Sequence, residues 1–228
     1  RLIKQDINKA IHYFSLSADK KQLNSLFNLG MIYMDNKFIP RDINKSIHYF
    51  TLAAELNHIK AQINLGSIYY NGEYIQPDVS KAIYYYSLAS NNNDPIAQYN
   101  LGIIYYHGEH IKQDINKAIH YFTLSSNQNY VRALFNLGEI YYNKKYIPQN
   151  INKAIHYFTL ASNQNDYSSQ FYLGLIYMNE NDINKAIYYF TLAANQNNAE
   201  SQINLGKIYY DGNLVQRDIK KAIYYFTL

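Results

Sequence analysis

Apolar and small residues recur along the chain at the spacing of a helix that buries one face. Within residues 94–108 they fall four, one and three positions apart, which places them on one side of a helix. Asp94 followed by Pro95 is a typical start, because the carboxylate accepts from free amides and proline fits the first helical position. Gly108 follows the last periodic residue, where helices often end. The residues that share the face are Ala97, Leu101, Gly102 and Tyr105.

A second helix is predicted after a loop. Asp114 is its expected cap, and the apolar residues that follow cover a wide stripe, so protein must pack on both sides of this helix. Its end is expected within 126–129, where asparagine can adopt the left-handed conformation that closes a helix without glycine. Gly102 on the first helix and Ala118 on the second are small enough for a close approach. The stripe consists of Ile115, Ala118, Ile119, Tyr121, Phe122 and Ser125.

The helix pair repeats along the chain. Leu-Gly pairs begin at intervals of 36 residues four times and 32 residues once. A period in this range is typical of a stacked-repeat solenoid, in which each unit buries its apolar faces against its neighbours. The sequence therefore predicts an all-α fold, a right-handed α-solenoid of antiparallel helix pairs. The leucines are Leu29, Leu65, Leu101, Leu137, Leu173 and Leu205.

We expect one continuous array without an interior domain boundary. The sequence opens within the repeat motif and stops inside the seventh copy of the Lys-Ala helix. It is therefore expected to be a fragment of a longer array, with targeting signals and partner domains lying outside it. The expected units are a partial repeat at 1–19 and repeats at about 20–55, 56–91, 92–127, 128–163, 164–195 and 196–228.

The repeat unit resembles the Sel-1-like repeat, a relative of the tetratricopeptide repeat. The shared pattern is Leu-Gly-x-x-Tyr, a loop with glycine, Asp-x-x-Lys-Ala and an aromatic pair. Leu101 precedes Ala118 by 17 positions, and the next leucine follows 19 later, whereas the tetratricopeptide pattern has 13 and 21. In the fifth repeat Leu173 precedes Ala186 by only 13 positions, which predicts a local change in superhelix pitch.

Composition and charge exclude several kinds of function. The sequence has no cysteine, so it cannot form a disulfide, a thiol nucleophile or a cysteine metal cluster. The net charge of +4 comes from scattered residues, without the basic run that marks a nucleic-acid-binding arm. No apolar stretch approaches the roughly 18–20 residues that cross a bilayer. We expect a cytoplasmic protein that neither binds nucleic acid nor inserts into membranes, and the secretory pathway stays open.

The histidines do not predict a metal or catalytic site. Four of the seven occupy one slot in four repeats and are interpreted as repeat-packing residues, since coordination needs ligands that converge on one ion. No nucleophile elbow, phosphate-binding loop or zinc-protease motif is present. We predict no catalytic residue, cofactor or metal, and hence no enzyme. The four are His12, His48, His120 and His156.

One set of residues suggests a binding surface. The resemblance implies that the two positions before each Leu-Gly line the concave face, where carboxamides hold an extended peptide. A carboxamide both donates and accepts, so it can meet any peptide group. The alternative is that these asparagines satisfy a neighbouring helix or its carbonyls. Tyr172 interrupts the series. The candidates are Asn28, Asn64, Asn100, Asn136 and Asn204, preceded by Phe27, Ile63, Tyr99, Phe135, Phe171 and Ile203, with Tyr70, Tyr106 and Tyr142 beside them.

The predicted function is a noncatalytic protein–protein interaction module, an adaptor or scaffold that binds partner proteins or extended peptides. By resemblance, the family assembles complexes in signalling and in endoplasmic-reticulum quality control. Two other roles stay open: a quality-control scaffold, and the regulatory arm of an enzyme such as a kinase whose catalytic domain lies outside this sequence.

Overall fold

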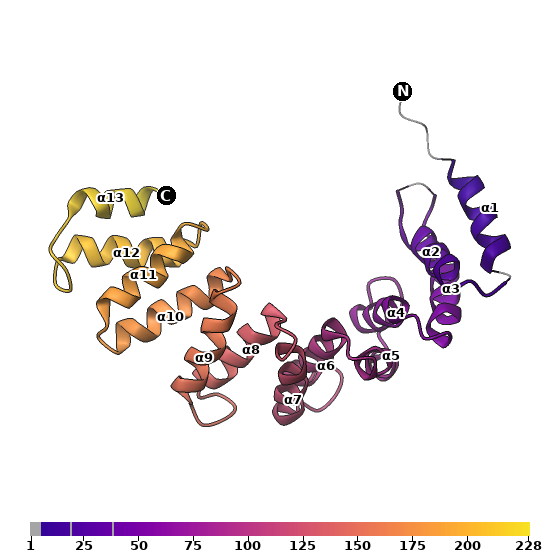
Figure 1. Ribbon diagram of the computed structural model, residues 1–228, viewed down its shortest axis with the longest axis horizontal. Coiled ribbons are helices and arrows are strands. Elements are labelled where there is room, and N and C mark those ends of the chain that lie inside the picture. The colour runs from indigo at the N-terminus through magenta and orange to yellow at the C-terminus, as the bar shows by residue number, and fades with distance from the viewer. Residues whose placement is uncertain (1–5, 19, 38) are drawn as a thin grey trace. The chain divides into compact units, whose positions relative to one another are not determined.

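The computed structural model describes residues 6–18, 20–37 and 39–228. Within these residues the chain forms thirteen α-helices and no strand, as predicted (Figure 1). The helices are α1 (Ile7–Ala18), α2 (Leu23–Met34), α3 (Ile43–Glu55), α4 (Ile59–Asn71), α5 (Val79–Asn91), α6 (Pro95–His107), α7 (Ile115–Ser126), α8 (Val131–Tyr142), α9 (Ile151–Ser162), α10 (Tyr167–Asn179), α11 (Ile183–Ala194), α12 (Ala199–Asp211) and α13 (Ile219–Thr227).

Two kinds of helix alternate. The even-numbered helices carry Leu-Gly and are called A helices here; the odd-numbered ones carry Lys-Ala or Lys-Ser and are called B helices, α1 being the first. Each A helix of the pairs α2–α3, α4–α5, α8–α9, α10–α11 and α12–α13 packs against the B helix that follows it. α4, α6, α10 and α12 also pack against the B helix that precedes them. An A helix therefore lies between two B helices, which is the solenoid arrangement.

The chain divides into two compact units, Arg1–Tyr121 and Phe122–Leu228, and the boundary falls within α7. The first unit contains α1 to α6 with the first half of α7. The second contains the remainder of α7 and α8 to α13. Each unit has cores of the same kind, built from A-helix leucines and B-helix aromatic rings.

The Leu-Gly glycine lies against an aromatic ring of the following B helix at Gly30, Gly66, Gly138, Gly174 and Gly206. A Cβ atom added to Gly138 would be 2.5 Å from Cδ1 of Phe158, and one added to Gly174 would be 2.5 Å from Cδ1 of Phe190. Both rings are fully buried. The predicted close approach of the two helices is confirmed in these repeats. The B-helix residue that faces the glycine is the aromatic ring four positions after the small residue of that helix.

A stacked pair of tyrosines also joins the A helix to the B helix that follows it. The rings of Tyr69 on α4 and Tyr85 on α5 are parallel to within 5°, with centroids 5.8 Å apart. The Lys81 ammonium lies 5.0 Å from the Tyr69 centroid and 3.4 Å from the Asp78 carboxylate, which caps α5. The Asp78 amide donates to the carbonyl of Tyr69 at 2.8 Å and so closes the intervening loop. The same closure joins Tyr33 to Asp42, Tyr105 to Asp114, Tyr141 to Asn150, Tyr177 to Asp182 and Tyr209 to Asp218.

Asparagine ends the B helices in the left-handed conformation, as the sequence predicts. Asn57 has φ 64°, its amide donates to the carbonyl of Ala54, and the next amide, of His58, donates to that of Ala53. This is the Schellman arrangement, which satisfies the last free carbonyls of a helix. Asn93, Asn129, Asn165 and Asn197 also have positive φ.

The short fifth repeat keeps the contacts between its two helices. Only a tight turn with Asn181 at φ 60° joins α10 to α11. The Tyr177–Tyr189 stack nevertheless has its centroids 5.6 Å apart and its rings within 6° of parallel. The backbone amide of Asp182 still donates to the backbone carbonyl of Tyr177. The fifth repeat is therefore four residues shorter in its loop alone. The change in superhelix pitch stays a prediction.

Replacing Gly138 by alanine should destabilise the second unit. The new methyl group meets a buried ring that has nowhere to move, at a cost of about 1–3 kcal/mol. Helix propensity returns about 1 kcal/mol, so we expect a net loss of up to about 2 kcal/mol in the free energy of unfolding, measured with urea. In a Phe158→Leu background the same substitution should cost less, and an equal cost in both backgrounds would refute the ring contact as the cause.

The His58 ring makes the start of α4 sensitive to acid. Its Nδ1 accepts from the Ala61 amide at 3.1 Å, the ring stacks on Phe27 at 4.5 Å, and burial, aided by the charge of Lys60, lowers the pKa of His58 below its ordinary value of 6.5. The unfolded chain therefore binds the proton more readily, so this contribution to stability is complete above pH 6.5 and is lost as the pH falls below it.

His58→Asn should remove this loss, because asparagine caps a helix without titrating. We expect the fall in melting temperature between pH 7.5 and pH 5.5 to be smaller in this variant than in the wild type. His48→Asn is the control, since that ring is exposed on α3. The interpretation fails if both variants and the wild type lose the same amount.

Candidate functional site

The residue before each Leu-Gly is less buried than the leucine and glycine that follow it. Leu65 and Gly66 are buried, whereas Asn64 just before them is half-buried. The first unit holds Asn28, Asn64 and Asn100, and the second holds Asn136, Tyr172 and Asn204, all half-buried. Within each unit these side chains recur once per A helix.

Hydrogen bonding differs among the five asparagines. Asn64 Nδ2 donates to the sulfur of Met31 at 3.4 Å, and Asn204 Nδ2 donates to the carbonyl of Glu200 in its own helix at 2.8 Å. The side chains of Asn28, Asn100 and Asn136 make no hydrogen bond within the described part of the chain. These three carboxamides can therefore bind a ligand without breaking an internal bond.

A different carboxamide ties the A helix to the preceding B helix. Gln62 is 1% exposed, and its Nε2 donates to the carbonyl of Ala54 and to Oδ1 of Asn57, each at 3.2 Å. Gln202 donates to the carbonyl of Ala194 at 3.3 Å. Sequence reasoning missed these residues, although glutamine three positions before the leucine in four of the six repeats was a signal. Gln98 and Gln170 are the other two, both buried.

The apolar residues beside the asparagines belong partly to the core. The Phe27 ring lies 5.7 Å from that of Phe50, and the Phe135 ring lies 6.0 Å from that of Phe158. Ile203, in contrast, is 46% exposed. Phe27 and Phe135 therefore pack partly against the core, whereas Ile203 lies at the surface. The remaining members, Ile63, Tyr99, Phe171, Tyr70, Tyr106 and Tyr142, are half-buried.

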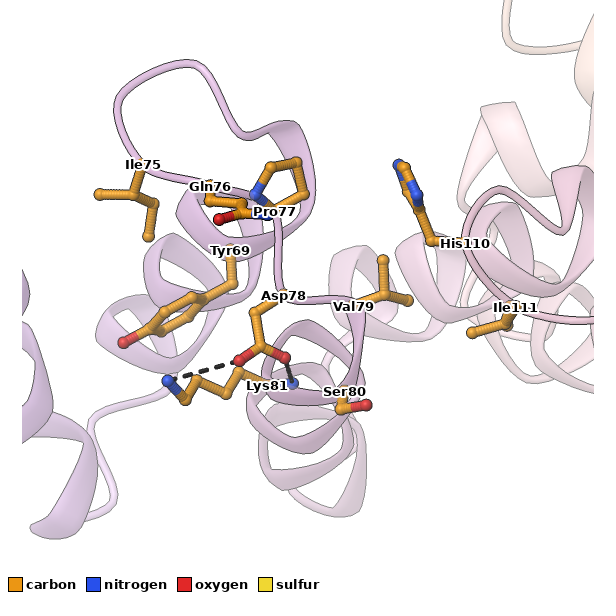
Figure 2. A pocket seen from close by; sticks show the side chains of 10 residues that line it. All are labelled: Tyr69, Ile75, Gln76, Pro77, Asp78, Val79, Ser80, Lys81, His110 and Ile111. Carbon is orange, nitrogen blue, oxygen red and sulfur yellow. Dashed lines mark hydrogen bonds and ion pairs between the residues drawn. The ribbon is translucent and has the colours of Figure 1, made fainter.

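A hollow of about 620 Å³ lies at the loop side of the first unit (Figure 2). One wall is the loop at Ile75–Pro77 and the first turn of α5, and the other is His110 with Ile111 from the next loop. The Asp78 carboxylate in this hollow is already paired with Lys81. Related hollows surround Asp114 and Asp218. They follow from the repeated loop, and their polar groups are used in capping helices.

Comparison with known proteins accounts for the repeat. The Sel1 repeat model matches residues 1–21, 23–58, 59–94, 95–130, 131–166, 168–198 and 199–228. The chain belongs to the Sel1 repeat family. Sel1 repeats are generally noncatalytic scaffolds that mediate protein–protein interaction. Among curated proteins none matches the sequence.

Two solved structures are similar over most of the chain. A protective antigen of uropathogenic Escherichia coli with an SLR fold has a TM-score of 0.81 and 25% identity, covering 94% of this chain and 47% of the antigen. A Sel1 repeat protein from Oxalobacter formigenes has a TM-score of 0.73 and 25% identity, covering 90% of this chain and 85% of that one. The chain thus spans about half the length of the E. coli protein.

The fold also recurs at lower identity. An immunity protein from Pseudomonas aeruginosa has a TM-score of 0.51 and 19% identity, covering 90% of this chain and 80% of that protein. Across residues 6–18, 20–37 and 39–228, no helix of this Sel1 repeat chain combines the length and apolar character needed to cross a membrane.

The histidine slot of these Sel1 repeats is a surface position, so the packing interpretation was wrong. His48 and His120 are exposed, each with its ring edge-on to the next tyrosine, at 5.2 and 5.1 Å. The slot lies two residues after the buried small residue of the B helix. Two residues turn a helix by about 200°, so the side chain points away from the core. His12 and His156 are exposed in the same way, and no three potential ligands gather as a metal site in the described ranges.

Proposed function

We propose that this chain is a noncatalytic adaptor module that holds an extended segment of a partner protein along the exposed faces of its A helices. The observation that carries the proposal is the division between two sets of carboxamides. Buried glutamines such as Gln62 and Gln202 already bind the neighbouring helix. The asparagines before Leu-Gly are thereby free of that role. Asn28, Asn100 and Asn136 keep donors and acceptors for a ligand, and Asn64 keeps its amide oxygen and a second N–H beside its contact with Met31.

The geometry suits a peptide backbone. Packed helices lie about 8–10 Å apart, and an extended strand rises about 3.3 Å per residue. One asparagine per A helix would therefore meet about every third residue of a ligand. Because a carboxamide bonds the peptide group itself, binding depends little on the ligand's side chains at those positions. The three asparagines of the first unit would together serve roughly nine ligand residues, about three each.

The test uses peptides selected on the wild-type chain from a display library. We expect Asn64→Ala with Asn100→Ala to weaken binding at least tenfold, because losing several hydrogen bonds of about 0.5–1.5 kcal/mol each reaches that factor. Fluorescence anisotropy with the selected peptides measures the change.

Two controls complete the design. Asn44→Ala with Asn116→Ala removes two exposed asparagines from B helices of the same unit and should leave the affinity unchanged. Gln62→Ala should lower the melting temperature, whereas the Asn64 and Asn100 substitutions should not. Unchanged peptide affinity in a folded Asn64, Asn100 variant would remove the proposal.

We propose further that the repeats form one uninterrupted array. Supporting this, the matched repeats 95–130 and 131–166 adjoin without a gap, and α7 continues as one helix through the unit boundary. Neighbouring repeats in such an array stabilise one another. Differential scanning calorimetry should then show one unfolding transition, and two separate transitions would contradict a single array.

A further inference from the structure

A hollow of about 550 Å³ opens in the second unit, at the repeat where tyrosine replaces the asparagine. Its apolar part consists of aromatic side chains from two A helices, α8 and α10. Its polar part comes from α10 and from the turn that leads into α12. The aromatic residues are Phe135, Tyr167, Phe171 and Tyr172.

The Tyr172 ring is held firmly in this hollow. It stacks on Phe158 with the centroids 5.0 Å apart and the planes within 10°, and Phe158 is fully buried. Tyr142 meets it edge-on at 5.3 Å, and Phe135 lies 5.8 Å away. With its position set by packing, the ring offers a fixed aromatic face, and such faces carry the negative part of the ring's quadrupole.

A negatively charged side chain also lines the hollow. Among the residues that line it, Glu200 carries the one full charge. Its Oε2 accepts from Asn198 Nδ2 at 3.3 Å, while the Asn198 side chain caps α12 by accepting from the Ser201 amide at 2.8 Å. This capping residue holds the carboxylate at the edge of the hollow.

A second carboxylate adds to the negative potential. Burial raises the pKa of Tyr172, and the nearby negative charge of Glu139 on α8 raises it further. Glu200 on α12 therefore lines the hollow, and Glu139 on α8 acts on the Tyr172 ring from the other neighbouring A helix.

We propose that this hollow binds an arginine side chain of the partner peptide. A guanidinium group stacks on aromatic faces and pairs with a carboxylate through its forked donors. Charge complementarity therefore favours arginine over acidic and apolar side chains. The inference rests on the proposed function, because it assigns one side chain of the same extended ligand, at the repeat whose asparagine rung is missing.

The probe is an acetylated and amidated pentapeptide with one arginine among glycine and serine. Two matched peptides carry citrulline, the neutral isostere, or leucine in its place. In ¹H–¹⁵N spectra of the full chain we expect the arginine peptide to shift the amides of Phe171, Tyr172 and Glu200 with saturation. The citrulline and leucine peptides should bind at least fivefold more weakly.

Variants locate the site. Glu200→Gln and Tyr172→Asn should each weaken the arginine peptide at least threefold, and Glu180→Gln, an exposed acid at the end of α10, should not. Glu200→Gln alters an exposed side chain, so the test does not depend on how Tyr172→Asn folds. Equal affinity for the three peptides, tighter binding of leucine, or no saturating shifts would overturn the inference.

The result can be separated from that of the proposed function. If the display-selected peptides bind and respond to the Asn64 and Asn100 substitutions while arginine shows no preference, only the arginine assignment fails. If no peptide binds the folded chain, the proposed function fails as well.

Discussion

The contact between the A-helix glycine and the B-helix ring sets the distance between the two helices of a repeat. The Phe158 and Phe190 rings are fully buried, and each lies where a Cβ atom of the facing glycine would be. A side chain at that point would push the helices apart. The buried leucine of the A helix and the buried alanine of the B helix would then be separated as well. Because A helices such as α4 and α10 lie between two B helices, a change in this distance would pass to the neighbouring repeat of the same unit. The other features of the repeat depend on this spacing.

The loop between the helices is the part that can vary. The amide of residue 182 donates to the carbonyl of residue 177 across the shortened loop, Tyr177 stacks on Tyr189 of the next helix, and both contacts are kept. Deleting four residues between two fixed points changes neither. The exposed Asp–Lys pair beside them, as in Asp182 and Lys185, contributes little by itself, since solvent screens ion pairs at the surface. Packing of rings and closure by the backbone hold the local geometry.

The two carboxamide sets differ in what surrounds them. Gln62 lies in the interface between helices, where an unmade hydrogen bond would be costly. Asn64, two positions later, lies on the other side of the helix and at the surface, where hydrogen-bonding groups remain usable by a partner. At Tyr172 the series changes from amide to aromatic, and Glu200 lines the hollow beside it. The chemistry along the A helices of the second unit therefore differs at this one repeat.

Much of this protein followed from the sequence by itself. The 36-residue period, the helix pairs, their asparagine and aspartate ends and the burial of leucine, glycine and alanine all follow from local periodicity and capping, which act within a few residues. The exposed position of His48 was also within reach, because a step of two residues turns the helix away from its core. The tertiary structure decided which side chains lie against the half-buried residues. Phe27 stacks on His58, and Asn64 reaches Met31, 33 positions away. Such contacts depend on how separate helices cross, and no pattern within one helix specifies the side chains on its neighbour.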